Sequence, residues 1–458
     1  MAYKWVDETK LNAALTASAD AIREKTGDTA QINFDMENET GFMTSINKIE
    51  NGLLPEVADK DVNFFDFYGR TIYSYTLDEI QSLTELPPAP PIDGAAFVEW
   101  SWSLEELKQE HDLMEVGPIY RNKNDSIDIV IDATLLKKFS LCYKIGGSAT
   151  VNWGDSTSTT ITGSEGVWTN ILAYADHEYS EYGIYTISIS GNGMLYGPYS
   201  LNGDNISIIN SPEHTVTDAY RKMVKRIVFP QNKKLYSAVG YSRFDVFLNN
   251  LNAEIISGGY VDNFYKNKIQ KIACLPSSKE NDLGALAGTN GNYCRDSSVH
   301  RVSLRKGPSA ISGYGVYSPF SESAVEKIIV PSSINQIGGA MRNAKQLKFV
   351  QFNATGDVTL GNGNSATATF EGSSLLQKVI FRGNVLQVPP KAFYGCSSIG
   401  IIDMSQCTSV PELQNIDAFA GCPSTMRIMV PQELYSEWIS ATNWSTYASY
   451  IHYVGEEE

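Results

Sequence analysis

The chain has 458 residues, and 36 Lys and Arg stand against 52 Asp and Glu, which gives a formal net charge of −16. This balance disfavours general binding to nucleic acids or to anionic membranes, because both partners require clustered basic residues. Hydrophobic residues make up 42% of the chain and aromatic residues 11%, so intrinsic disorder is also disfavoured. The composition favours a mainly β, multidomain protein that is exposed to the extracellular environment.

Two short amphipathic helices are predicted in residues 1–56. Their apolar residues recur at spacings of three and four, which places them along one stripe of a helix. Helices this short are marginal alone, so each must pack on the other, on a partner or on copies of itself. We assign residues 1–56 to attachment or oligomerisation, and a plain helical hairpin remains the alternative. The candidate contact residues are Leu11, Leu15, Ile22, Phe42, Ile46 and Ile49.

Residues 57–125 are predicted to form a small α/β spacer module. The alternating stretch from residue 62 to 75 predicts a hairpin that turns near Gly69. The sequence Ser103-Leu104-Glu105-Glu106 is a capping box, which predicts a short helix. Trp100 and Trp102 precede it, and we expect at least one of them in the core rather than in a ligand-stacking site.

Residues 126–221 are predicted to form a small β-sandwich. Ile127, Ile129 and Ile131 recur at every second position, which is the period of a half-buried strand. Further short apolar runs follow, and Gly, Asn and Asp separate them as turns do in sandwiches.

Residues 222–458 repeat a short apolar strand motif, seen as residues 224–230 and again as residues 325–331. Variants follow at a spacing of about 22–30 residues, the period of a leucine-rich-repeat solenoid. We expect one short strand per coil, with apolar positions stacked on the next coil and Lys or Arg pointing outward. Phe393 and Cys396, and their counterparts Phe419 and Cys422, are expected to fill the coil interior.

Two further features bear on the cellular context. None of the six cysteines lies in a Cys-x-x-Cys pair, so we expect reduced, mostly buried thiols and no zinc site. No apolar run near residue 1 has the length of a secretory signal, and no run of 18 apolar residues predicts a membrane span.

The repeat region resembles BspA-type leucine-rich repeats. The turn Ala392-Phe393-Tyr394-Gly395-Cys396 and the strand ending in Val430-Pro431 carry the resemblance. It implies a solenoid fold and indicates no single function.

Residues 126–221 look like a polycystic-kidney-disease (PKD) domain. Trp153-Gly154-Asp155 and His177-Glu178-Tyr179 carry that resemblance, and Ser156 stands where the family's turn usually has glycine. The resemblance implies turn and core roles for these residues.

The N-terminal segment is similar to the start of tail proteins in phages of Gram-positive gut bacteria. Residues 19–27 and 40–42 carry this likeness, and the modules that follow occur beside PKD-like and BspA-type regions in such proteins. The resemblance implies a tail fibre or baseplate-associated protein that recognises the host.

No motif for catalysis, cofactor binding or metal binding stands out. The five histidines form no short metal pair, and the chain contains no P-loop and no Gly-x-Ser-x-Gly elbow. His177 beside Asp176 is expected in a surface loop. Asp128 and Asp132 share one face of a strand and leave open a carboxylate pair of a polysaccharide depolymerase. We expect a non-enzymatic protein with no cofactor.

The resulting hypothesis is a phage tail protein that binds a bacterial surface glycan or envelope protein during attachment. It would be made in the host cytoplasm, assemble with other tail or baseplate proteins and form a homo-oligomer, with a trimer as the leading expectation. A bacterial surface adhesin and an envelope depolymerase are the alternatives. Aromatic residues among Gly, Asn and Ser in the wider first coils are the receptor-binding candidates, unless they only fill those coils. They are Tyr236, Tyr241, Phe244, Tyr260, Tyr265, Tyr293, Tyr314 and Tyr317.

Overall fold

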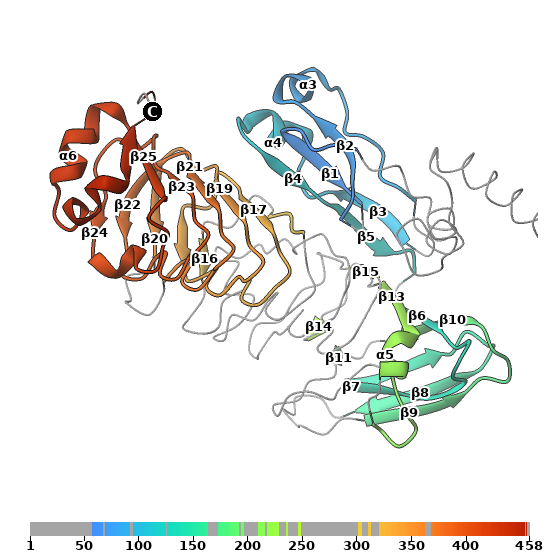
Figure 1. The fold of residues 1–458 in the computed structure, drawn as a ribbon. Helices are drawn as coiled ribbons and strands as arrows, with labels where there is room; N and C mark the ends of the chain where they lie inside the picture. The colour runs from blue at the N-terminus through green and yellow to red at the C-terminus, as the bar shows by residue number, and fades with distance from the viewer. Residues whose placement is uncertain are drawn as a thin grey trace, which may run out of the picture.

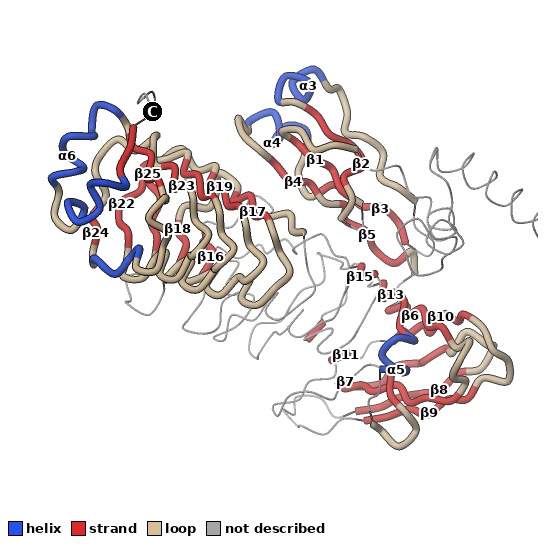
Figure 2. The backbone as a smooth tube through the Cα atoms, viewed as in Figure 1, coloured by secondary structure: helices blue, strands red, loops and turns tan. Residues whose placement is uncertain are grey.

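The fold was analysed in a computed structural model of the chain, drawn as a ribbon in Figure 1 and by secondary structure in Figure 2. The structure describes residues 57–66, 69–91, 95–124, 126–163, 173–191, 194–196, 209–215, 218–228, 235–236, 246–248, 301–304, 310–312, 320–361, 368–453 and 455. The predicted helices of residues 1–56 lie outside this part.

The first described unit, which we call the module, spans residues 57–124 and combines two small sheets with two helices. Strands β1 (Val62–Phe65), β2 (Thr71–Tyr75) and β4 (Met114–Val116) form one sheet in the order β2-β1-β4, and β3 (Ala95–Trp100) pairs antiparallel with β5 (Pro118–Asn122). The hairpin predicted near Gly69 is confirmed, since β1 and β2 pair antiparallel and Gly69 has a φ of 73° between them.

Both helices of the module begin at capping boxes. Helix α4 (Leu104–Gln109) starts at the predicted box, where the Ser103 hydroxyl accepts a hydrogen bond from the Glu106 amide and the Glu106 carboxylate accepts one from the Ser103 amide. Helix α3 (Leu77–Ser82) has the same arrangement with Thr76 and Glu79. Two orphan amide donors are satisfied at each start, which stabilises helices of only six residues. Trp100 and Trp102 are both buried, as expected of core residues.

The second unit is a β-sandwich built around the long strand β7 (Lys138–Asn152). Strand β9 (Ala173–Glu178) pairs with the first half of β7 and β8 (Ser158–Gly163) with the second half, so β7 bridges two layers. Strand β6 (Ile127–Asp132) pairs with β10 (Ile184–Ser190), and its three isoleucines are 0–2% exposed, as predicted. Between them, Val130 and Asp132 are half-buried but Asp128 is buried too, so the alternation is only partial. Shorter elements complete it: β11 (Met194–Tyr196), β12 (Ile209–Asn210) and α5 (Asp218–Met223).

The sandwich sheet continues into the repeat region. Strand β13 (Val224–Val228), predicted as the first repeat strand, pairs antiparallel with β6 and parallel with β15 (Val246–Leu248). Strand β14 (Leu235–Tyr236) pairs parallel with β11. The predicted boundary between residues 221 and 222 falls within α5. Strands on the two sides of this boundary pair with each other, so the sandwich and the repeat region are joined by backbone hydrogen bonds.

The repeat region is a solenoid with two parallel sheets. The six-stranded sheet contains β17 (Lys327–Val330), β19 (Phe349–Phe352), β21 (Lys378–Phe381), β23 (Ile401–Asp403), β25 (Arg427–Val430) and β26 (Ile451–Tyr453). The five-stranded sheet contains β16 (Ala310–Ser312), β18 (Gln336–Gly338), β20 (Asp357–Leu360), β22 (Asn384–Val388) and β24 (Glu412–Leu413). In the first sheet, β17 to β25 were predicted and β26 was not, and the second strand of each coil was not predicted either.

Aromatic rings stack along the solenoid interior. Phe370 stacks on Phe393 and Phe393 on Phe419, with ring centroids 5.0 and 5.5 Å apart. The Cys396 and Cys422 thiols donate hydrogen bonds to the carbonyls of Phe370 and Phe393 on the preceding coils. This confirms the predicted filling role of these turns. Four short helices complete the C-terminal coils and cap: η2 (Ile416–Phe419), η3 (Gln432–Leu434), α6 (Tyr435–Ser440) and η4 (Trp444–Tyr450).

None of the helices in the described part of the chain combines the length and the apolar character of a membrane span. Of the cysteines described, none forms a disulfide; Cys142, Cys396 and Cys407 are buried and Cys422 is half-buried, as expected of mostly buried thiols.

Candidate binding surface

The residues predicted to bind a receptor lie outside the described side chains. Tyr236 belongs to β14, but its side chain is not described, and the other seven aromatic candidates lie outside the described residues. The same holds for the six apolar candidates for attachment in residues 1–56. The structure therefore neither brings these residues together nor separates them, and their roles stay predictions.

The described solenoid offers a different surface, the outward side of its six-stranded sheet, which we call the outer face. Alternate residues of each strand point inward, for example Ile328, Val350 and Ile402, which are all 0% exposed. The residues between them point outward, and the in-register pairing aligns these in two rows. The first row is Lys327, Phe349, Lys378, Ile401 and Arg427. The second row is Ile329, Gln351, Ile380, Asp403, Met429 and His452.

The module covers the beginning of the outer face. Ile329 is 4% exposed and belongs to the hydrophobic core of the module, together with Phe64 and Trp102, and Phe349 packs against the same core. The Trp102 indole Nε1 donates a hydrogen bond to the Leu304 carbonyl at 3.1 Å. Figure 1 shows the module beside the β17 end of the sheet. Ile329 is thus an outward strand residue that the module buries.

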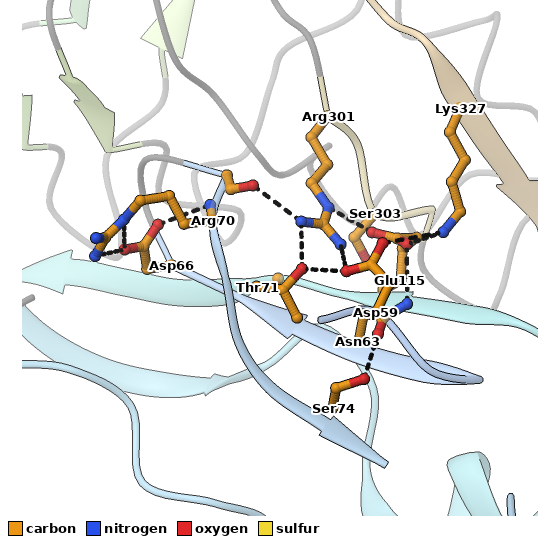
Figure 3. Close-up of polar contacts among 12 residues, drawn as sticks. Asp59, Asn63, Asp66, Arg70, Thr71, Ser74, Glu115, Arg301, Ser303 and Lys327 are labelled. Carbon is orange, nitrogen blue, oxygen red and sulfur yellow. Dashed lines mark hydrogen bonds and ion pairs between the residues drawn. The ribbon is translucent and has the colours of Figure 1, made fainter. Parts of the chain in front are cut away.

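A buried carboxylate holds the centre of this contact (Figure 3). Glu115 of β4 is 4% exposed and pairs with Arg301 Nε at 2.5 Å and with Lys327 Nζ at 2.6 Å. Arg301 also donates from Nη1 to the Gly69 carbonyl and the Thr71 hydroxyl, at 2.9 and 2.8 Å. Paired and hydrogen-bonded ions tolerate burial, whereas a single unpaired ion does not, so a docking position that buried Glu115 without these two cations would be disfavoured.

One further charge pair and several neutral hydrogen bonds, such as Asn353 Nδ2 to the Leu113 carbonyl at 3.0 Å, complete the contact. Asp112 of the module accepts hydrogen bonds from Arg382 Nη2 at 2.8 Å and from Gln351 Nε2 at 3.0 Å. Glu110 accepts one from the Ser332 hydroxyl at 2.5 Å. An acidic edge of the module therefore meets a part of the solenoid that combines cations with apolar, amide and hydroxyl side chains.

On the later coils the outer face is less covered, although Ile380 of β21 is still only 6% exposed. Lys378, Ile401 and Met429 are half-buried and Arg427 is exposed. In the described part of the chain, the recorded contacts of the module extend along the solenoid as far as Arg382, directly after β21. The rows continue through β23 and β25, so a surface of similar composition is available there.

The polar residues of the sandwich serve its structure. His177 lies in β9 and not in the expected loop, and its ring stacks on Trp153 with centroids 4.4 Å apart. Its Nε2 pairs with Asp155 Oδ2 at 2.9 Å, while the neighbour Asp176 accepts a hydrogen bond from Ser140 instead. These contacts close a corner of the sandwich and form no catalytic pair with Asp176.

Asp155 is held as a carboxylate. Burial alone would raise its pKa, but hydrogen bonds from the Thr157 hydroxyl and amide and from His177 lower it overall. Its stabilising contribution is therefore complete above the ordinary carboxyl pKa of 3.8 and is lost as the pH falls through the lowered value.

The two carboxylates considered for hydrolysis have ordinary partners. Most pairs of carboxylates on a strand are exposed to solvent, but Asp128 is only 7% exposed. Its carboxylate accepts a hydrogen bond from the Ser126 hydroxyl. Asp132 accepts one from the Thr134 amide. Among the described residues, no group of three or more His, Cys, Asp or Glu side chains is placed to hold a metal ion.

Comparison with known proteins identifies one part of the chain. No curated protein matches it. Residues 315–437 match the BspA type leucine-rich repeat region in six copies. This stretch contains the strands from β17 to β25 of both parallel sheets, whereas β16 and β26 lie outside it. This part of the chain is therefore a BspA-type leucine-rich repeat region.

Proposed function

We propose that this chain is a non-enzymatic structural protein of a phage tail, a fibre or baseplate component, that binds a bacterial surface receptor during host attachment. The observation that carries the proposal is the outer face, a parallel sheet whose strands β17, β19, β21, β23 and β25 lie in the BspA-type repeat region and which the module covers only at its beginning. Repeats of this type suit binding to proteins or surfaces, because each coil adds area and contacts only its neighbours.

The module supports this role by giving the binding part a fixed orientation. Its core includes Ile329 of the solenoid, and Glu115 pairs with Arg301 and Lys327. A spacer that is docked rather than loosely tethered transmits the orientation of the virion to the receptor-binding coils.

The assignment to a virion rests on the resemblance of residues 19–27 and 40–42 to phage tail proteins. We propose that residues 1–56 attach the chain to other tail proteins and to sister copies, with a trimer favoured. The protein would be made in the host cytoplasm and would reside in the phage tail. The receptor would be a glycan or an envelope protein.

The proposal is tested by adsorption of the fluorescently labelled full-length protein to a panel of Gram-positive gut bacteria. We expect strain-selective binding that competes with phage adsorption, and no release of oligosaccharide from capsule or wall glycan. If the protein binds none of the strains that are hosts of a phage carrying this gene, the receptor-binding role is refuted. Steady release of oligosaccharide would establish the depolymerase instead.

A gene neighbourhood of tail and baseplate genes would support the virion assignment, whereas a chromosomal locus without them would favour the adhesin. Light scattering of the purified protein measures its oligomeric state, and a monomer would refute the trimer.

A further inference from the structure

We infer that the open part of the outer face, formed by Lys378, Ile401, Arg427 and Met429, binds an acidic protein surface with apolar side chains beside its carboxylates. This inference rests on the proposed receptor-binding function and names the chemistry of the partner. The module already occupies the first coils of the same face and shows which chemistry this face accepts.

The module demonstrates what the outer face accepts. Its carboxylates Glu115 and Asp112 meet the solenoid cations Arg301, Lys327 and Arg382. Between these pairs, the outward side chains of Ile329 and Phe349 enter or contact the apolar core of the module. The first coils are thus complementary to a protein surface that combines negative charge with apolar groups.

The same alternation continues beyond the module. The in-register row places Lys378, Ile401 and Arg427 after Lys327 and Phe349, so a cation alternates with an apolar residue on successive coils. Neighbouring strands lie about 4.8 Å apart, which sets the cations of this row roughly 10 Å apart. A partner that matches the first coils by charge and shape would match the later coils as well.

The opposite sheet of the solenoid lacks this pattern. Its outward row consists of Gln336, Thr359, Gln387 and Glu412, which the register aligns on successive coils. The Gln414 amide donates to Gln387 Oε1 and the Gln387 amide to the Leu360 carbonyl, so these side chains bond along the solenoid. In a chain of net charge −16, cations in a regular row on one face favour an anionic partner there.

The side chains between the cations favour a protein over an anionic glycan. Ile401 and Met429 are aliphatic and half-buried, and they lie beside the exposed Arg427. Methionine and arginine are enriched in protein interfaces, where apolar groups exclude water around the charged pairs. Asp403 is the only acidic residue in the two rows, and it also accepts a hydrogen bond from the Ser405 amide.

The test uses the full-length chain and a peptide that copies residues 108–117, the acidic segment that already docks on this face. The peptide is immobilised at high density, beside a version with Gln or Asn at each acidic position and beside polygalacturonate. The test variant combines Lys378→Glu and Arg427→Glu. The control variant combines Lys345→Glu and Lys391→Glu, which make the same charge change at exposed or half-buried positions outside the two rows.

We expect the acidic peptide to bind the native chain at least tenfold more tightly than its amide version. The Lys378/Arg427 variant should lose at least tenfold in affinity, and the control variant should stay within twofold. Equal loss in both variants would overturn the inference, as would tighter, Lys378- and Arg427-dependent binding of polygalacturonate. Unchanged adsorption of the Lys378/Arg427 variant to host cells would refute the inference and leave the proposed function standing, whereas failure of the native chain to adsorb would refute the proposed function itself.

Discussion

Replacing Glu115 with alanine should weaken the docking of the module on the solenoid. The substitution leaves Arg301 and Lys327 without their main partner, and the side chains of these residues are only 15% and 32% exposed. Removal of one member of a buried ion pair costs about 3–5 kcal/mol, because the remaining charge stays desolvated. Asp59 remains 3.8 Å from Arg301 and 3.7 Å from Lys327, so we expect the lower end of this range, about 3 kcal/mol.

Native-state hydrogen exchange measures this effect in the full chain. A loss of about 3 kcal/mol should accelerate exchange of the most protected amides of β1 and β4 roughly a hundredfold, since each 1.4 kcal/mol corresponds to a factor of ten. Amides of β10 in the sandwich should not change. The matched control is Glu326→Ala, whose partner Lys348 lies 2.8 Å away with both side chains about half exposed. Such a pair contributes at most about 1 kcal/mol.

The docking argument fails if Glu115→Ala changes exchange in β1 and β4 no more than Glu326→Ala does. A second variant separates charge from packing, namely Glu115→Leu combined with Met at positions 301 and 327. Replacement of a buried ion cluster by apolar residues is often neutral, so this variant should recover most of the protection. If this variant loses as much protection from hydrogen exchange as Glu115→Ala does, the geometry of the contact, and not the unpaired charge, determines the stability of the docking.

Three further predictions test the sandwich and the solenoid separately. Ser156 has a φ of 73°, so Ser156→Gly should stabilise the sandwich by up to about 1 kcal/mol in thermal unfolding, and a lower melting temperature would contradict the turn geometry. Burial raises the pKa of Cys407 to about 11 and that of Cys396 well above its ordinary value, so both thiols should resist iodoacetamide at pH 7.5 until the protein is denatured, as mass spectrometry would show. Phe393→Ala should destabilise the solenoid by about 3–5 kcal/mol in denaturant, while the exposed neighbour Tyr394→Ala should cost less than about 1 kcal/mol, and equal effects would refute the stacked interior.

The local pattern of the sequence predicted much of the fold. A strand in each described coil, the stacked Phe turns, the hairpin at Gly69 and the capping box at Ser103 all depend on residues close together in the chain. The second strand of each coil escaped prediction because these strands are short and their outward residues are mixed. Strand β24 has two residues and β22 carries the exposed Leu386, so no clear period marks them.

The binding surface could not be predicted for a different physical reason. Glu115 and Arg301 are 186 positions apart, and neither lies in a motif that would indicate a partner. Ile329 alternates correctly as an outward residue of its strand, yet the module buries it. Burial of an outward residue depends on which other unit docks there, and that information lies in the complementarity of two surfaces. The alternation of cations and apolar residues becomes visible only once the register of β17, β19, β21, β23 and β25 places them in one row. Regular pairing of coils therefore aligns surface residues that are far apart in the sequence into the rows from which the partner chemistry was inferred.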